Sequence, residues 1–170
     1  MNKKRILTIF AAVLIAALCL WRFWPHTLKD ILDMNDAAFD TISVHVSEFG
    51  IADNAPRIDV YRLDLSSPDA DSYAAVLSIL QDTKFRADFR NLLPWDISTV
   101  DSGIKNISHS ANVMLTWGEG DDSCYLSFHG ERIVSFDIRG NTGYLIYHPT
   151  NRAVLTALAE YAKANGEFLT

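Results

Sequence analysis

The hydrophobic pattern of the chain starts with one long apolar run, from Ile6 to Trp21, in which Thr8 is the only polar residue. Three basic residues at positions 3–5 precede the run, which is the order of charge and hydrophobicity in a secretory signal. The run exceeds the usual apolar segment of such a signal, about 7–15 residues. It falls slightly below the roughly 20 residues that cross a bilayer. The start of the chain is therefore predicted to be directed to a membrane.

The residues after this run favour retention in the membrane over cleavage. Signal peptidase requires small residues just before its cut, whereas this chain has large side chains there. Aromatic residues bracket Arg22, as in an interfacial belt with a snorkelling cation, and Pro25 ends the helix. These aromatic residues are Trp21, Phe23 and Trp24. We predict that residues 1–24 are an uncleaved single-pass anchor, in the membrane through residues 6–24, with the amino terminus inside and the carboxyl-terminal domain outside the cytoplasm.

Cys19 leaves two alternatives open. A cut after Cys19, with Ala17 upstream, would release the domain, and lipidation of Cys19 would tether it as a lipoprotein. The segment resembles a bacterial lipoprotein signal, but such a signal has a small residue directly before the cysteine, where this chain has Leu18. The sequence favours the anchor over both forms of processing.

Two strands and a helix are predicted in the first half of the remaining chain. The segment "TISVHVS", residues 41–47, alternates apolar and polar residues as a half-buried strand does. In "RIDVYRLDL" the apolar positions change parity between Val60 and Leu63, which predicts a second strand with a bulge near Tyr61. Helical spacing of apolar residues then predicts a helix over residues 70–82.

Four alternating segments follow, namely "ANVMLTW", "SCYLSFH", "RIVSFDI" and "GYLIYH". Their connections are too short for crossovers, so these strands are predicted to pair as an antiparallel meander. A last helix is predicted with Thr150 as its amino-terminal cap and Gly166 at its end. Residues 83–111 show no clear pattern.

These elements predict an α+β domain over residues 41–170. Its architecture is expected to be an antiparallel sheet, with a four-stranded carboxyl-terminal meander and two helices packed on one face. Residues 25–40 are expected to be a linker with a short helical turn after Thr27.

Alternation within the meander divides its side chains between two faces. One face is almost wholly apolar, is expected to take the helices, and includes Cys124 as a small hydrophobe. The other mixes apolar with hydrogen-bonding side chains, which favours a binding surface. The candidate binding residues on this second face are Tyr125, Ser127, Asp137 and Tyr147. The alternative is that "FRADFRNLLPW", residues 85–95, folds over this face, since it has apolar residues to bury.

Charge restricts the possible partners. The chain has 15 basic and 21 acidic residues, and its first 24 positions hold four basic and no acidic ones, so the remainder carries 11 − 21 = −10. Such a domain repels phosphate backbones, which disfavours nucleic-acid binding, and an anionic membrane surface would also repel it. Because Cys124 is the only cysteine outside the predicted anchor, no disulfide forms within the domain.

Three histidines provide an alternative with chemistry. His109, His129 and His148 lie at strand ends that a meander would bring to one rim, and with Glu131 nearby they could hold zinc for a metal-assisted hydrolase. Strand spacing opposes this, because three intervals of ~4.8 Å separate the first and last of them by roughly 14 Å. The acidic loop "GEGDDS", residues 118–123, lacks the ligand spacing of a calcium site. No catalytic, metal or cofactor site is predicted.

The order of elements covers most of the chain: the amino-terminal apolar segment, the "FDTISVHV" strand, one helix, the antiparallel strands and the terminal "LTALAEYAK" helix. In this layout the chain resembles small exported or lipoprotein-like domains of unknown function from Gram-positive bacteria. The resemblance implies exposure outside the cytoplasm and carries no catalytic residue. We therefore predict a non-catalytic domain that binds an envelope protein or component, the alternatives being the metal-assisted hydrolase and a purely structural envelope protein.

Overall fold

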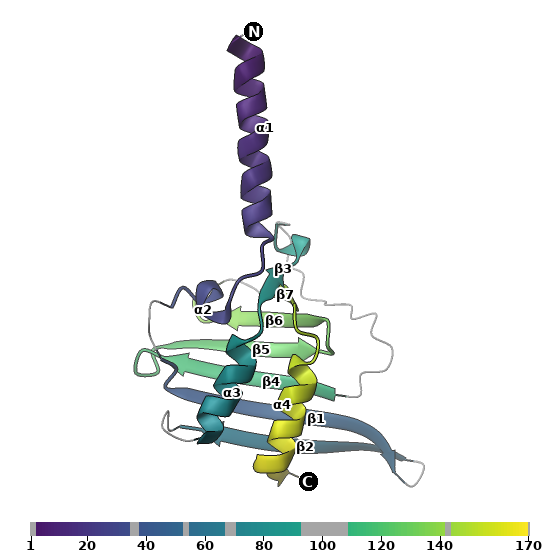
Figure 1. The fold of residues 1–170 in the computed structure, drawn as a ribbon. Helices are drawn as coiled ribbons and strands as arrows, with labels where there is room; N and C mark the ends of the chain where they lie inside the picture. The colour runs from purple at the N-terminus through teal and green to yellow at the C-terminus, as the bar shows by residue number, and fades with distance from the viewer. Residues whose placement is uncertain are drawn as a thin grey trace.

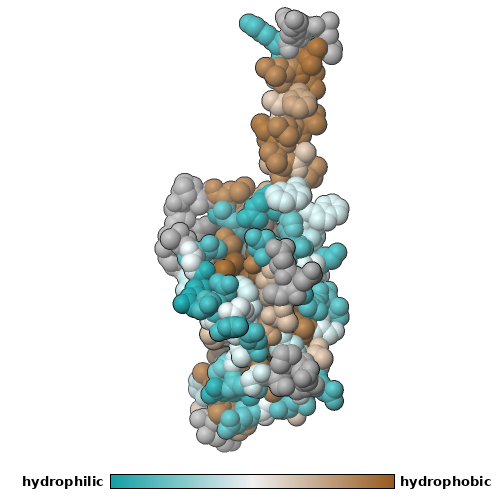
Figure 2. Space-filling view, turned by 90° about the vertical axis from the view of Figure 1, so that its left-hand side faces the viewer, coloured by the Kyte–Doolittle hydropathy of each residue, from teal (hydrophilic) through white to brown (hydrophobic). Residues whose placement is uncertain are grey.

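The computed structural model describes residues 3–34, 38–52, 55–66, 71–92, 109–141 and 144–169. Helix α1 (Lys3–Arg22) projects away from the rest of the molecule as a single rod (Figure 1). Its side chains form an apolar column above a domain surface in which hydrophilic side chains are frequent (Figure 2). Within the described residues, the segment Lys4–Arg22 is the one helix long and apolar enough to cross a membrane. A signal sequence near an amino terminus has the same properties.

Within the described residues, eight strands form one antiparallel sheet in the order β3-β7-β6-β5-β4-β1-β2-β8. The strands are β1 (Thr41–Ala52), β2 (Ala55–Leu65), β3 (Phe85–Ala87), β4 (His109–Trp117), β5 (Asp122–His129), β6 (Ile133–Ile138), β7 (Leu145–Pro149) and β8 (Glu167–Leu169). An antiparallel sheet combined with separate helices is an α+β fold, as predicted. The outer strands β3 and β8 are both short, which limits the unpaired backbone at the sheet edges.

Two helices cross the sheet on the side nearer the viewer in Figure 1. They are α3 (Asp71–Gln81) and α4 (Val154–Asn165), and α4 contacts β1, β2, β4 and α3. A one-turn helix, α2 (Leu28–Ile31), and a 3₁₀ turn, η1 (Phe89–Leu92), complete the described elements. A capping box fixes the start of α2, because Thr27 and Asp30 each accept a backbone hydrogen bond from the other.

The core lies between the sheet and these helices. Alternate residues of the strands are buried there, and so is the inward stripe of α4. The largest fully buried side chains of this core are Phe39, Phe85, Phe128, Phe136, Leu28, Ile42, Leu80, Leu115, Leu126, Leu158 and Val44. Ile146 is also fully buried, but it lies on the other face of the sheet, opposite Ser135. Leu28 and Phe39 belong to the segment expected as a linker, so residues before β1 also contribute to the core.

Two predictions of local geometry are wrong. Strand β2 has no bulge near Tyr61, because its register with β1 is continuous from Leu65 to Ala55. Tyr61 instead lies on the core side, where its ring contacts that of Phe168 at a centroid distance of 5.4 Å. Thr150 does not cap α4 either, since its hydroxyl donates to the backbone oxygen of Lys84.

Strand β7 is turned opposite to the predicted parity. The pairing of Val134 with Tyr147 and of Phe136 with Leu145 places Tyr147 and Leu145 on the helix-covered face. Four consecutive residues, 144–147, are apolar or aromatic, so the sequence pattern does not distinguish the two faces here. The register with β6 makes the choice, and it removes Tyr147 from the second face.

Gly166 permits the close approach of α4 to β2 that lets β8 join the sheet. A Cβ atom at this position would lie 2.5 Å from the Ala162 backbone oxygen and 2.7 Å from that of Arg62. We expect Gly166→Ala to lower the free energy of unfolding by about 1–3 kcal/mol, because backbone atoms must move. Thermal or urea unfolding measures this loss.

The matched control is Gly50→Ala, since a Cβ atom at Gly50 would meet nothing within 4 Å. This substitution replaces a glycine within β1 by a residue with less backbone freedom, so stability should stay the same or rise slightly. Equal losses for the two variants would contradict the role given to the close approach at Gly166.

Candidate functional site

The sheet face away from α3 and α4, called here the open face, carries a central row of exposed side chains. Tyr125 on β5 lies directly opposite Met114 on β4 and Asp137 on β6. Met114 is 44% exposed, Tyr125 is 43% exposed, and Asp137 is exposed as well. Ser127 lies two residues along β5 on the same face, opposite Ser135. The structure therefore brings three of the four predicted binding residues together.

The fourth, Tyr147, lies on the other side of the sheet. It is 4% exposed, and its ring contacts Phe136 at a centroid distance of 4.8 Å. Phe136 in turn packs edge-on against Phe85. Tyr147 is thus part of the aromatic core at one end of the sheet, and its assignment to the binding face is wrong.

A second exposed group continues the open face along the hairpin of β1 and β2. Phe49 pairs with Ile58, and Ile51 pairs with Pro56, on the parity that faces away from the helices. Phe49, Ile51 and Ile58 are all exposed. Apolar side chains in this position are available for contact with another molecule.

The three histidines of the proposed rim do not converge. Strand parity puts His109 on the helix-covered face, 3.4 Å from a carboxylate oxygen of Glu48, whereas His129 and His148 lie on the open face. His129 lies 3.1 Å from the hydroxyl of Ser135, and burial lowers its pKa. In the described ranges, no group of three or more His, Cys, Asp or Glu side chains is placed to hold a metal ion.

His148 belongs to a different cluster, which no pattern in the sequence indicates. Its Nε2 lies 2.8 Å from the carboxylate of Asp88, and its Nδ1 lies 2.9 Å from the backbone oxygen of Arg132. A carboxylate and a carbonyl both accept, so the ring satisfies both contacts when it donates from both nitrogens. His148 thereby ties β7 to the turn between β5 and β6 and to the segment after β3.

Asp88 is the centre of this cluster. It is 5% exposed and receives the Nε and Nη2 hydrogens of Arg90, each over 2.9 Å, as well as the Arg90 backbone N–H over 2.8 Å. Burial by itself would raise the pKa of Asp88, but the hydrogen bonds from Arg90 and His148 outweigh this and lower it to about 2. The carboxylate is therefore charged, and both of its oxygens are engaged.

Three further arginines surround a pocket of about 400 Å³ beside His148. The pocket is lined by Arg86, Arg132, His148, Pro149, Thr150 and Arg152. No carboxylate is among the described residues of this lining. Among the described residues, the structure gives none of these three guanidinium groups a hydrogen bond or an ion pair. As far as the described residues go, the pocket is consequently a site of uncompensated positive charge in an acidic chain.

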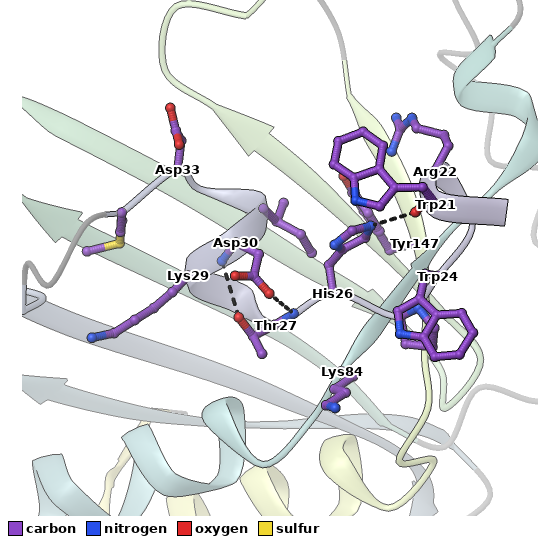
Figure 3. A pocket seen from close by; sticks show the side chains of 13 residues that line it. Trp21, Arg22, Trp24, His26, Thr27, Lys29, Asp30, Asp33, Lys84 and Tyr147 are labelled. Atoms are coloured by element: carbon purple, nitrogen blue, oxygen red, sulfur yellow. Dashed lines mark hydrogen bonds between the residues drawn. The ribbon is translucent and has the colours of Figure 1, made fainter. Parts of the chain in front are cut away.

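A larger pocket, of about 780 Å³, lies where α1 meets the domain. Figure 3 shows the rings of Trp21 and Trp24 on its side nearer α1 and the short helix α2 on the other. Its charged groups include Arg22, Lys84 and Asp30, and the Asp30 carboxylate is used in the cap of α2. Both signs of charge and aromatic rings line this pocket, which fits an interfacial position but no defined chemistry.

Cys124 offers no nucleophile at the surface. Its side chain is 1% exposed within the core. Burial, with a smaller contribution from the charge of Asp137, raises the pKa of the thiol to about 12. The thiol is therefore protonated at neutral pH.

The Asp88 cluster predicts an acid-dependent stability. Because the pKa of Asp88 is about 2 in the folded chain and 3.8 in the unfolded chain, its contribution is present above about pH 4 and is lost as the pH falls through 2. We expect Asp88→Asn to remove about 2 kcal/mol at pH 7. Urea unfolding at pH 7 and at a series of pH values between 4 and 2 measures this.

The matched control is Asp137→Asn, which changes an exposed carboxylate on the open face. Its acid dependence should follow that of the unsubstituted chain, whereas the Asp88 variant should lose less stability over the same pH interval. An Asp88 variant as stable and as acid-sensitive as the parent would show that the cluster contributes nothing to folding.

Comparison with known proteins gives no relative for this geometry: no family model, no curated protein and no solved structure matches the chain.

Proposed function

We propose that this chain is a single-pass membrane protein whose domain lies outside the cytoplasm and, without catalysis, binds a protein of the cell envelope through the open face. The observation that carries the proposal is the row of Met114, Tyr125 and Asp137, exposed side by side on a sheet whose opposite face is the core. The resemblance in layout to small exported or lipoprotein-like domains of unknown function from Gram-positive bacteria agrees with a position outside the cytoplasm.

The anchor is supported by the length and flanks of α1. Its 20 residues rise by about 30 Å, the thickness of the hydrocarbon core of a bilayer. The basic residues at its start favour an amino terminus on the cytoplasmic side. At its other end, exposed Trp21 and Trp24 flank Arg22 at the junction with the domain, where an aromatic belt would lie.

The open face has the composition of a protein-binding surface. Tyr125 offers an aromatic ring and a hydroxyl, Met114 offers an adaptable apolar side chain, and Asp137 adds a charge that can select a partner. Exposed Phe49 and Ile58 extend the same face along the hairpin. Strands β4 to β7 pair in chain order and form the four-stranded meander that carries this row. Helices α3 and α4 pack on the opposite face of the sheet.

Two of the histidines near this face are engaged by neighbouring side chains. His129 contacts Ser135, whose hydroxyl is buried, and His148 is held by Asp88. A nucleophile must be reachable by its substrate and activated by a base. These arrangements favour binding over hydrolysis as the role of the open face.

Retention of α1 is tested at the amino terminus of the native protein. We expect mass spectrometry of the protein purified from its own membranes to give a chain that retains residues 3–22, because large side chains occupy the position where signal peptidase needs small ones. A mature chain beginning at Leu20, or a diacylglyceryl group on Cys19, would overturn the anchor.

Binding through the open face is tested by photocrosslinking in whole cells. A photoreactive phenylalanine at position 125 should give one discrete protein adduct, and the same residue at position 160, exposed on α4, should give none. A second variant, Tyr125→Ser, should change the free energy of unfolding by less than about 0.5 kcal/mol, as other surface substitutions do.

The two readouts exclude different errors. Equal adducts from positions 125 and 160 would show collision without a specific surface. A large loss of stability in Tyr125→Ser would show that the ring is covered, and the open face would then not be a binding surface.

A further inference from the structure

Three arginines line the pocket beside His148. We propose that Arg86, Arg132 and Arg152 bind a phosphate group, and that this group is the headgroup phosphate of an anionic phospholipid in the membrane that α1 enters. The choice of a lipid rests on the anchor proposed above, whereas the phosphate chemistry rests on the pocket alone.

The charge in the pocket calls for an anion. The nearest carboxylate in the cluster, Asp88, already accepts hydrogen bonds from Arg90 and His148 on both oxygens. It therefore has little capacity left for the three arginines. Within the described part of the chain these three neighbouring cations have no counter-charge, so they repel one another, and a bound anion removes this repulsion. Such an arrangement is unusual in a domain that carries −10.

The backbones that carry the three arginines are fixed relative to one another. Arg86 on β3 pairs with His148 on β7, and His148 contacts the backbone oxygen of Arg132 over 2.9 Å. On the third side, the Thr150 N–H donates to the Lys84 backbone oxygen over 2.8 Å, two residues before Arg152. The pocket is thus assembled by hydrogen bonds that do not use the guanidinium groups, which stay available for a ligand.

Guanidinium groups contributed by three separate segments suit phosphate better than a carboxylate. Each is a planar fork of donors that matches two oxygens, and a tetrahedral phosphate offers oxygens to more than two such forks. Arg152 also lies just before α4, whose first turn has no acidic residue and no side-chain cap. The partial positive charge of that helix start adds to the attraction for an anion.

The pocket lies close to the junction with α1. His26, four residues after the end of α1, exchanges two backbone hydrogen bonds with Phe85, the neighbour of Arg86. Figure 1 accordingly places β3 and β7 at the end of the sheet nearest to α1. Phe89 and Leu92 of η1, which contacts β7, are exposed at the same end. Apolar and cationic side chains together are typical of surfaces that contact a bilayer.

Net charge does not oppose this binding. Screening limits the field of exposed charges to a Debye length of about 8 Å at physiological ionic strength. The headgroup would therefore meet the local potential of the three arginines. The repulsion expected from the acidic domain applies to surfaces without such a cluster.

Arginine modification tests the site in the full-length chain, held in micelles of an uncharged maltoside detergent. Phenylglyoxal is added with phosphatidylglycerol, phosphatidylcholine or inorganic phosphate, and the rate at each arginine is read by peptide mass spectrometry. We expect phosphatidylglycerol to slow the reaction at Arg86, Arg132 and Arg152 and leave Arg57 unchanged, because Arg57 lies on the distant β1–β2 hairpin, paired with Asp59. Phosphatidylcholine should protect less.

Single substitutions measure how much each arginine contributes to the affinity for the lipid. Arg86→Gln and Arg152→Gln should each raise the phosphatidylglycerol concentration needed for half-maximal protection of the remaining arginines about tenfold. Loss of a charge-assisted hydrogen bond has an effect of this size. The control Arg57→Gln should not change this concentration. Thermal unfolding of each variant in the same detergent separates loss of binding from loss of fold.

The arms of the experiment separate the two sources of phosphate and the two proposals. Protection by inorganic phosphate but not by phosphatidylglycerol would overturn the lipid and leave a site for a soluble phosphate. Protection by none of the three, or equal protection of Arg57, would overturn the site itself. A cleaved amino terminus in the native protein would overturn the anchor while leaving phosphate protection measurable.

Discussion

Burial of one face of an eight-stranded sheet is the constraint on which the rest of the structure depends. Alternate side chains of the strands enter one continuous core, which α3, α4 and the segment before β1 cover. A side chain in an antiparallel strand can occupy only one of two faces, so filling this core assigns the remaining positions to the open face. The row of Met114, Tyr125 and Asp137 exists because Leu115, Cys124 and Phe136 are needed on the other side.

At the β3–β7 edge the core needs polar interactions to hold its outermost segments. Phe85, Phe136 and Tyr147 pack there as aromatic neighbours, but β3 has only three residues and few backbone hydrogen bonds. Asp88 compensates by binding Arg90 next to it and His148 on β7. Both oxygens of this buried carboxylate are occupied by Arg90 and His148. The carboxylate is therefore not available to pair with the arginines around the adjacent pocket.

The sequence predicted those features that repeat along the chain. The long apolar run, the α+β class and the helix at α3 follow from periodicity over many residues, and the structure describes each of them. The parity of β7 was wrong because residues 144–147 offer apolar side chains to both faces, so only pairing with β6 decides. The bulge at Tyr61 was wrong for a related reason: an aromatic ring can join the core side while Val60 stays on the other face.

The site was predictable only where it follows from strand alternation. Tyr125, Ser127 and Asp137 share the open face because they lie at positions of one parity on two adjacent strands. The Asp88 cluster joins residues 60 positions apart, and no local pattern in "FRADFRN" indicates which histidine will reach the carboxylate. The same holds for the arginine pocket, whose members come from β3, a turn and the approach to α4.

The charge of the molecule differs between the whole domain and the surface around the arginine pocket. Net charge follows from composition. It describes the electrostatic potential of the domain at distances much larger than the spacing between its charged groups. The attraction of a ligand to the pocket depends on the charges within a Debye length of it. There the local potential is set by the three arginines and by Asp88, whose oxygens are already hydrogen-bonded. A strongly acidic chain can therefore present a cationic pocket at the sheet edge joined to α1, because the fold uses the nearest carboxylate to hold that edge together.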